Sequence, residues 1–175
     1  MSAKFGVRPL SENHVGATAN LKMLTPAEFA TLEDNPKTVE DFLFPEGVEN
    51  PFEGQTDLDK SWHSLHYLLT GAVGPDGTAA GDAILGGSAI GPNLGYGQAR
   101  LITAVRANEI FRALSDLNFT GRYDSFDPLC SEVNRVYLGA SIAVGRASLE
   151  HFFRLLKDFY ARASSTGSAV LAYMA

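Results

Sequence analysis

The sequence predicts a single α+β domain in which a small mixed or antiparallel sheet packs against several helices. The expected elements follow one another as strand, helices, strands, helix, helix and strand, and this order contains no regular βαβ repeat. The 175 residues suit one domain, and no linker divides them. Hydrophobic residues make up 45% of the chain, which is enough to build a substantial core.

The N-terminal region divides at about residue 18. Met1–Thr18 has no hydrophobic period and contains glycine, proline and asparagine, so we expect an N-terminal extension or irregular arm. The domain itself then covers residues 19–175. Its first element is a short strand over Ala19–Leu24, where apolar residues alternate weakly.

Two short helices are expected next. Thr25 suits the N-cap because Pro26 follows at the first helical position and Glu28 lies three residues after the threonine. The helix that they begin should end before Asn35. A second short helix is expected over Thr38–Leu43, followed by a turn-rich stretch.

A longer helix is predicted over Asp57–Thr70. Asp57 or Asp59 can cap its start, and Gly71 can end it in a left-handed conformation. The apolar residues of its inner stripe recur at helical spacing: Leu58, Trp62, Leu65 and Leu69.

More than half of the 17 glycines lie between residues 71 and 97. Apolar residues interrupt this run, so it is not a low-complexity linker. We expect a loop over Gly71–Gly81, a short strand over Ala83–Leu85, a tight turn with a further loop, and a strand over Gln98–Ile102.

The second half of the chain is expected to be mostly helical. The clearest helix is Ser148–Ser165, because it has a wide apolar face and alternating charges at i, i+4 on the opposite face. The other expected elements are a helix from Thr103 to Leu117, an irregular or briefly helical Phe119–Cys130, a short strand or turn within Glu132–Leu138, and a buried strand over Ala169–Met174.

The composition excludes several classes of partner. The formal net charge is −6 and no run of lysine and arginine occurs, which argues against nucleic acid. No apolar stretch is long enough to span a bilayer, and no signal peptide is visible, so we expect a soluble cytoplasmic protein. The single cysteine, Cys130, excludes an intrachain disulfide and a thiolate cluster.

Several segments, taken in order, resemble the YfbM-like family, a group of bacterial proteins of unknown function. The resemblance departs from the family pattern after Val136, where Tyr137 is kept but the usual proline and tryptophan are missing. It implies a single α+β domain and transfers no catalytic residue. The matching segments are Asp57–Gly71 (DLDKSWHSLHYLLTG), Ala83–Gly87 (AILGG), Gly95–Thr103 (GYGQARLIT), Arg122–Asp124 (RYD) and Gly167–Met174 (GSAVLAYM).

The predicted 57–70 helix carries the densest candidate chemistry. At about 100° per residue, Asp59, His63 and His66 fall within about 60° of one another. This arrangement suits an acid–base pair with His66 as catalytic group and Asp59 as its orienting carboxylate. A metal site would need further ligands that the spacing does not select, so we expect neither a metal nor a cofactor. The competing interpretation makes His66 a boundary histidine bonded to a backbone group, His63 an exposed residue and Asp59 a helix cap.

The glycine-rich run supplies the candidate ligand-binding residues. Backbone amides near paired glycines can approach an anion, and an arginine can clamp a carboxylate or phosphate. The alternative is that the glycines only permit tight packing and that Arg100 forms an internal ion pair with Asp59 or Asp124. The candidate residues are Trp62, Gly86, Gly87, Tyr96 and Arg100.

Two functions of different classes fit these residues. The first is a bacterial binding or interaction module that recognises another protein or a small ligand through the glycine-rich surface beside the 57–70 helix. The alternative is a small-molecule hydrolase with His66 as acid–base group and Arg100 as anion clamp. A third interpretation gives the motifs a structural role only.

Overall fold

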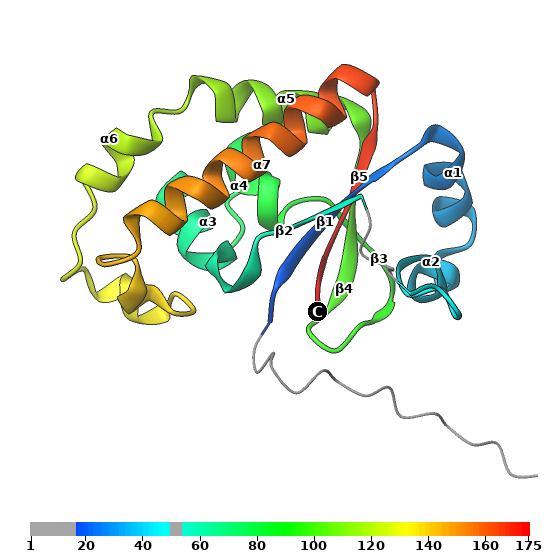
Figure 1. Cartoon of the computed structure of the whole chain (residues 1–175), viewed down its shortest axis with the longest axis horizontal. Coiled ribbons are helices and arrows are strands. Elements are labelled where there is room, and N and C mark those ends of the chain that lie inside the picture. Colours follow the sequence, from blue (N-terminus) through cyan, green and yellow to red (C-terminus); the bar gives the residue numbers. More distant parts are fainter. Residues whose placement is uncertain (1–16, 50–53) are drawn as a thin grey trace, which may run out of the picture.

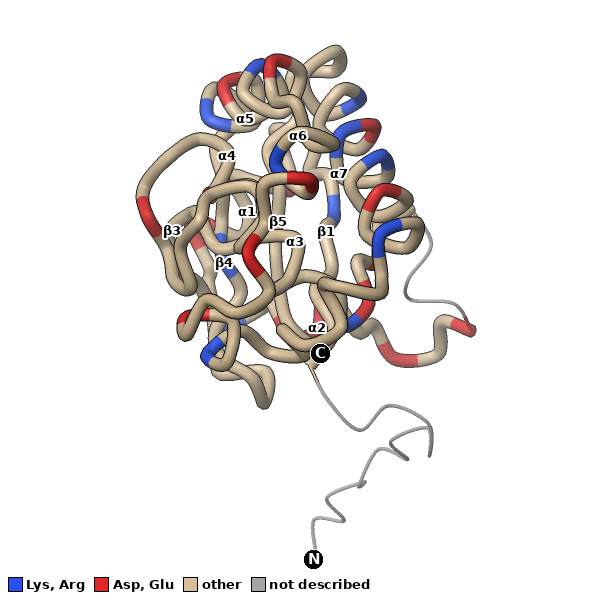
Figure 2. Tube along the Cα trace, turned by 90° about the vertical axis from the view of Figure 1, so that its left-hand side faces the viewer, with Lys and Arg blue, Asp and Glu red and all other residues tan. Residues whose placement is uncertain are grey.

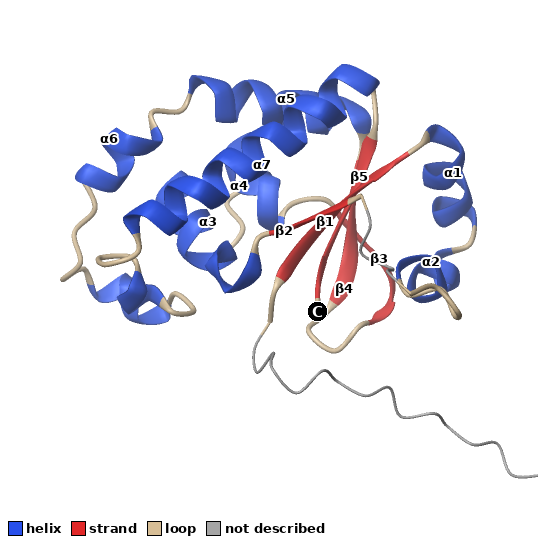
Figure 3. Ribbon diagram, in the orientation of Figure 1, coloured by secondary structure: helices blue, strands red, loops and turns tan. Residues whose placement is uncertain are grey.

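The computed structural model describes residues 17–49 and 54–175, so most of the predicted N-terminal extension lies outside the described residues. Its centre is a five-stranded sheet with the order β2-β1-β5-β4-β3, in which every neighbouring pair is antiparallel (Figure 3). The strands are β1 (Ala19–Leu24), β2 (Gln55–Asp57), β3 (Ser88–Asn93), β4 (Gln98–Ile102) and β5 (Ala169–Met174).

Helices cover both faces of this sheet (Figure 1). One face carries α1 (Pro26–Asp34) and α2 (Val39–Leu43), which are joined by the 3₁₀ turn η1 (Pro36–Thr38). The larger helical layer lies on the other face and consists of α3 (Trp62–Thr70), α4 (Ala79–Leu85), α5 (Ala104–Asp116), α6 (Phe119–Asp124) and α7 (Arg146–Thr166).

The alternation of β5 explains the two layers. Val170 and Ala172 pack into the core beneath the larger layer, whereas Leu171 and Tyr173 pack into the core beneath α1 and α2. A strand that is buried on both faces reads as a continuous apolar run, as AVLAYM does. The two hydrophobic cores are therefore separated by the sheet itself.

The outer surface of α7 carries both signs of charge. Lysine and arginine alternate with aspartate and glutamate along this helix in Figure 2. Arg146 bonds Asp124 of α6 and Glu150 on its own helix, at 2.7 and 2.9 Å. This pattern is typical of a solvated helix face rather than of a surface for nucleic acid. Within the described part of the chain, no helix is both long and apolar enough to cross a membrane.

Much of the expected secondary structure is confirmed. The strands at 19–24, 98–102 and 169–174 and the helices that follow Thr25 and Thr103 lie where they were expected. The capping box is complete, because Thr25 Oγ1 accepts from the amide of Glu28 at 3.2 Å and the Glu28 carboxylate accepts from the amide of Thr25 at 2.7 Å. The expected helix at 148–165 is α7, which is slightly longer.

Three expectations in the first half of the chain were wrong. Ala83–Leu85 is the end of helix α4 rather than a strand, because Thr78 caps that helix by accepting from the amide of Gly81. The helix predicted over Asp57–Thr70 begins only at Trp62, after the strand β2 and the 3₁₀ turn η2 (Asp59–Ser61). The loop expected after Gly71 is correspondingly shorter and ends at Thr78.

Strand β3 was missed because its composition argues against a strand. The segment SAIGPN contains Gly91 and Pro92, both of which weaken strand pairing. The pairing of β3 with β4 shifts register between Ile90 and Asn93, and β3 lies at the edge of the sheet. A proline is tolerated at such an irregular edge position. For Glu132–Leu138, where a short strand or a turn was expected, the turn is confirmed, because the stretch contains most of the 3₁₀ turn η3 (Ser131–Arg135).

Gly91 should tolerate alanine less well than a glycine of the same backbone conformation in open space. Gly91 has φ +76°, and an added Cβ would lie 2.7 Å from Val39 Cβ and 2.9 Å from the Pro36 carbonyl oxygen. Gly77 has φ +74°, and a Cβ added there would have no described atom within 4 Å apart from its own chain neighbours. We expect Gly77→Ala to cost about 1 kcal/mol and Gly91→Ala a further ~1–3 kcal/mol in the free energy of unfolding, measured by urea denaturation. Equal losses would show that β3 does not pack tightly against η1 and α2.

Candidate functional site

The two histidines of α3 hold the loop that follows this helix. His63 and His66 lie on successive turns, and their Nε2 atoms donate to the carbonyls of Val73 (2.6 Å) and Gly74 (3.0 Å). A carbonyl oxygen can only accept, so Nε2 carries the proton in both rings. The two histidines, whose i, i+3 spacing suggested an acid–base site, therefore anchor two consecutive carbonyl groups of the loop.

His66 is buried and neutral. Its exposed fraction is 0%, and Nδ1 has no hydrogen-bond partner among the residues that the structure describes. Burial lowers the pKa of His66 because it disfavours the charged imidazolium, and this effect outweighs the opposing influence of the Gly74 carbonyl and of Asp76. The competing interpretation of His66 as a boundary histidine bonded to a backbone group is confirmed for the bond and wrong for the position, because the ring is fully buried.

The expectation that His63 is exposed was wrong. The ring is half-buried, and Nδ1 accepts from the amide of Tyr137 at 2.9 Å. The indole of Trp62 stacks on it, with ring centroids 4.6 Å apart and planes 2° apart. Trp62 Nε1 donates to the Ala17 carbonyl at 3.1 Å. Trp62, the first of the candidate ligand-binding residues, thus joins α3 to the start of β1.

Asp59 and His66 are not brought together. Asp59 is an exposed residue of η2 with φ +49°, and its amide donates to the Asp57 carboxylate at 2.6 Å. The carboxylate that accepts a backbone amide here is therefore that of Asp57. Because His66 is fully buried on the following helix, the catalytic pairing of these two residues stays a prediction without a geometric basis.

Arg100 and the glycine pair Gly86–Gly87 are close together, as a ligand site would require. However, the arginine side chain is bonded to the glycine carbonyls themselves. The guanidinium donates from Nε to the Gly86 carbonyl and from Nη2 to the Gly87 carbonyl, both at 2.9 Å. The expected ion pair with Asp59 or Asp124 is absent from these contacts, and Asp124 pairs with Arg146 instead. The planar fork of Arg100 fits two adjacent carbonyls at the end of α4, where the negative end of the helix dipole lies.

Tyr96 lies apart from α3, at the tip of the β3–β4 hairpin. Asn93 Oδ1 accepts from the amides of Gly95 (2.8 Å) and Gly97 (3.1 Å), and these glycines have φ +115° and +117°. The asparagine therefore braces a turn that only glycine adopts easily. The side chain of Tyr96 is 56% exposed on this tip.

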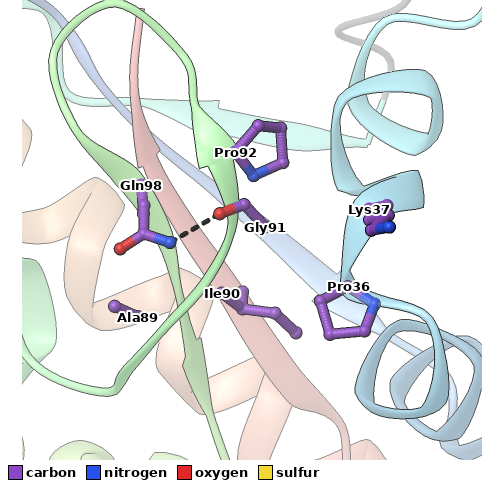
Figure 4. Close-up of a pocket in the computed structure, with 7 residues that line it drawn as sticks. All are labelled: Pro36, Lys37, Ala89, Ile90, Gly91, Pro92 and Gln98. Atoms are coloured by element: carbon purple, nitrogen blue, oxygen red, sulfur yellow. Dashed lines mark hydrogen bonds between the residues drawn. The ribbon is translucent and has the colours of Figure 1, made fainter.

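A cleft that the sequence did not predict lies beside this hairpin. It has a volume of about 470 Å³ and is open to solvent. Figure 4 shows Pro36 and Lys37 of η1 on one side and residues from β3 and β4 on the other. The second group comprises Ala89, Ile90, Gly91, Pro92 and Gln98. Gln98 Nε2 donates to the Gly91 carbonyl at 2.6 Å.

The cleft includes part of the glycine-rich run, but its other wall is η1 rather than the helix that carries the histidines. The sequence indicated only that a helix ends at Asn35–Pro36. It did not indicate that this segment faces β3 and β4 across a cleft. Among the residues that the structure describes, no group of three or more His, Cys, Asp or Glu side chains could hold a metal ion.

Replacing His66 by glutamine should remove part of the pH dependence of stability. The folded-state pKa of His66 lies below its ordinary value of 6.5, so the unfolded chain binds a proton at a pH where the folded chain does not. The wild type should therefore lose stability as pH falls below about 6.5, by at most ~1.4 kcal/mol per pH unit from this group. His66→Gln can keep the bond to Gly74 but does not titrate. Identical slopes in urea denaturation between pH 7.5 and 5 would contradict this role.

Arg100 should act on stability rather than as an anion clamp. Arg100→Met leaves two carbonyls without their donors, and we expect a loss of about 1–3 kcal/mol in the free energy of unfolding. Arg100→Lys keeps the charge but not the fork, so it should restore only part of this loss. Inorganic phosphate should raise the melting temperature of neither the parent nor the lysine variant. A phosphate-dependent rise in the parent that is lost in Arg100→Met would instead support the clamp.

Comparison with known proteins supports the resemblance noted in the sequence. The model of a family described as "Domain of unknown function (DUF1877)" matches residues 15–173. The crystal structure of YfbM from Escherichia coli, a protein of unknown function, has a TM-score of 0.66 and 18% sequence identity, covering 90% of this chain and 99% of that chain. At this identity the likeness shows the fold alone, and the search of curated proteins found no match. The chain belongs to the DUF1877 family and has the YfbM-like α+β fold.

Proposed function

We propose that the protein is a bacterial, cytoplasmic interaction module that binds an extended segment of a partner protein with the β3–β4 hairpin. The observation that carries this proposal is the exposed Tyr96 on a braced tip of the hairpin whose strands line an open cleft. It retains the binding function suggested by the sequence and moves the contact surface away from α3, toward η1.

Tyr96 has the properties of an interface anchor. Tyrosine offers a large amphipathic ring at a low cost in conformational entropy, and it is enriched among residues that dominate binding energy. Both amides that flank Tyr96 in the chain, those of Gly95 and Gly97, are already bonded to Asn93. A partner would therefore meet a preorganised turn and need not pay for ordering it.

The cleft specifies the chemistry of the segment that would fill it. Its surface is mainly apolar, with the Ile90 side chain extending toward the ring of Pro36 and the Pro92 ring lying further along β3 (Figure 4). Lys37 supplies the only charge in the lining, and its ammonium has no ion pair within the described ranges. We therefore expect a segment with an apolar side chain over Ile90 and a carboxylate within reach of Lys37.

The hydrolase alternative finds no support in this arrangement. The lining residues of the cleft include no carboxylate, histidine, serine, threonine or cysteine. His66 is buried under the loop after α3, and the Arg100 guanidinium is bonded to Gly86 and Gly87. A hydrolytic site requires a nucleophile or an acid–base group that faces the substrate, and among the described residues the cleft presents none.

Site-specific photocrosslinking in cells of the source bacterium tests the binding proposal. A photoreactive phenylalanine analogue at position 96 or at position 89, an exposed alanine that lines the cleft, should give an adduct of the same mass, because both positions would face one partner while Lys37 keeps its charge. The same analogue at Arg154, on the exposed face of α7, should not give that adduct. Yields are compared by blotting against an epitope on this chain.

The charge variants of Lys37 complete the test. With the analogue at position 96, Lys37→Glu should lower the yield at least ~10-fold, whereas Lys37→Arg should retain most of it, since arginine also pairs with a carboxylate. Binding at this cleft would be refuted if the same adduct formed equally well from position 154. It would also be refuted if the crosslinking yield from position 96 were the same in Lys37→Glu and Lys37→Arg.

A further inference from the structure

We infer that His63 is a proton-sensitive latch between α3 and the turn Tyr137–Leu138, and that protonation of Nδ1 releases this turn from the helix. The latch is independent of the hairpin surface proposed above. It rests on the two bonds of one ring, on the backbone strain beside it and on the lack of a carboxylate partner for the charged form.

The hydrogen bonds of His63 fix its tautomer. Nε2 donates to the Val73 carbonyl at 2.6 Å, and Nδ1 accepts from the Tyr137 amide at 2.9 Å. A backbone amide can only donate, so Nδ1 must carry a lone pair in this arrangement. The neutral ring thus joins α3 to two segments at once, the loop after this helix and a turn that lies 74 residues further along the chain.

Protonation affects these two bonds differently. The imidazolium still donates from Nε2 to Val73, so the loop contact persists. At Nδ1 the added proton faces the Tyr137 N–H, and two donors then oppose each other. The proton therefore removes the contact with the turn and leaves the contact with the loop.

The turn is already under strain where the latch holds it. Leu138 has φ +54° and ψ +29°, a left-handed conformation that is unfavourable for a non-glycine residue, and its side chain is 49% exposed. Val136 and Ile142 on either side are buried. Tyr123 also bonds the Ile142 carbonyl at 2.6 Å. The flanks thus stay anchored, and the released part is the turn between them.

Among the described residues, no carboxylate lies within ion-pair distance of the His63 ring. Within residues 17–49 and 54–175, His63 takes part in no ion pair. Its closest titratable neighbour on α3, His66, is neutral and buried, so it offers no negative charge. The titratable and charged groups on the segments that flank the ring are Tyr67 of α3, Asp59 and Lys60 of η2, Asp76 of the loop, Glu132 and Arg135 of η3, and Tyr137 itself. Of the groups on the helices that pack against α3, Asp82 of α4 pairs with Arg106 and Asp124 of α6 pairs with Arg146.

Release of the turn would change the surroundings of Trp62. The Tyr137 ring stacks near the indole, with centroids 6.1 Å apart, while the His63 ring covers the indole face at 4.6 Å. The acid form would uncover part of this aromatic cluster. Because Trp62 is the only tryptophan of the chain, its fluorescence reports on the latch without a contribution from another tryptophan.

The test follows the Tyr137 amide and Trp62 together between pH 7.5 and 5. We expect the hydrogen-exchange protection of the Tyr137 amide, corrected for the intrinsic effect of pH, to fall at least ~10-fold with the same midpoint as the Trp62 fluorescence change. In His63→Asn, whose carboxamide oxygen can accept from Tyr137 and does not titrate, both signals should stay flat. His66→Gln should keep both transitions.

Two outcomes would overturn the latch. An imidazolium quenches a stacked indole by itself, so a fluorescence change with constant Tyr137 protection would mean that the ring is protonated without release. Transitions that survive in His63→Asn and disappear in His66→Gln would show that the proton binds His66 rather than His63. If His63→Asn does not fold, the ¹⁵N shifts of His63 in the wild type provide the test. Protonation of Nδ1 without a loss of Tyr137 protection would also refute the latch.

Discussion

The pairing of β1 with β5 is the constraint on which the rest of the structure depends. Six residue pairs join these strands, from Ala19 opposite Met174 to Leu24 opposite Ala169. Thr18 and Ala175 extend the ladder by exchanging both backbone hydrogen bonds, at 2.9 and 3.0 Å. β2 adds to the free side of β1, and β4 with β3 adds to the free side of β5. Segments from opposite ends of the described chain must therefore meet before either core can close, an arrangement that favours slow folding because loop closure precedes the stabilising contacts.

The sequence was most informative where local chemistry and tertiary packing agree. The Thr25–Glu28 box, the helical period of α7 and the apolar run of β5 each determine an element whose neighbours reinforce it. Prediction failed where a non-local contact decides. The glycine and proline of β3 argue against a strand, and only the alignment with β4 and the support of η1 reveal one. The AILGG segment reads equally well as a strand or as the end of a helix until the Thr78 cap is known.

The candidate site shows the same division. A spacing of three residues correctly placed His63 and His66 on one side of a helix, but it could not say what faces them. The structure places backbone carbonyls there, so groups that resembled a reactive pair hold a loop instead. Arg100 was correctly placed near Gly86 and Gly87, but the partners are their carbonyls rather than a bound anion. The Pro36–Lys37 wall of the cleft lies some fifty residues from the strand it faces, and no local pattern could indicate that pairing.

The irregular edge of β3 has a consequence for the behaviour of the protein at high concentration. An exposed edge strand offers unpaired amides and carbonyls to other chains, and flat apolar edges promote aggregation. Here the proline removes one donor, the register shift bends the strand, and η1 packs against its middle. The opposite edge is β2, which is only three residues long. Both edges of the sheet are thus protected against pairing with the strands of another copy. A partner that approaches the hairpin would therefore have to bind through side-chain contacts rather than by adding a strand to the sheet.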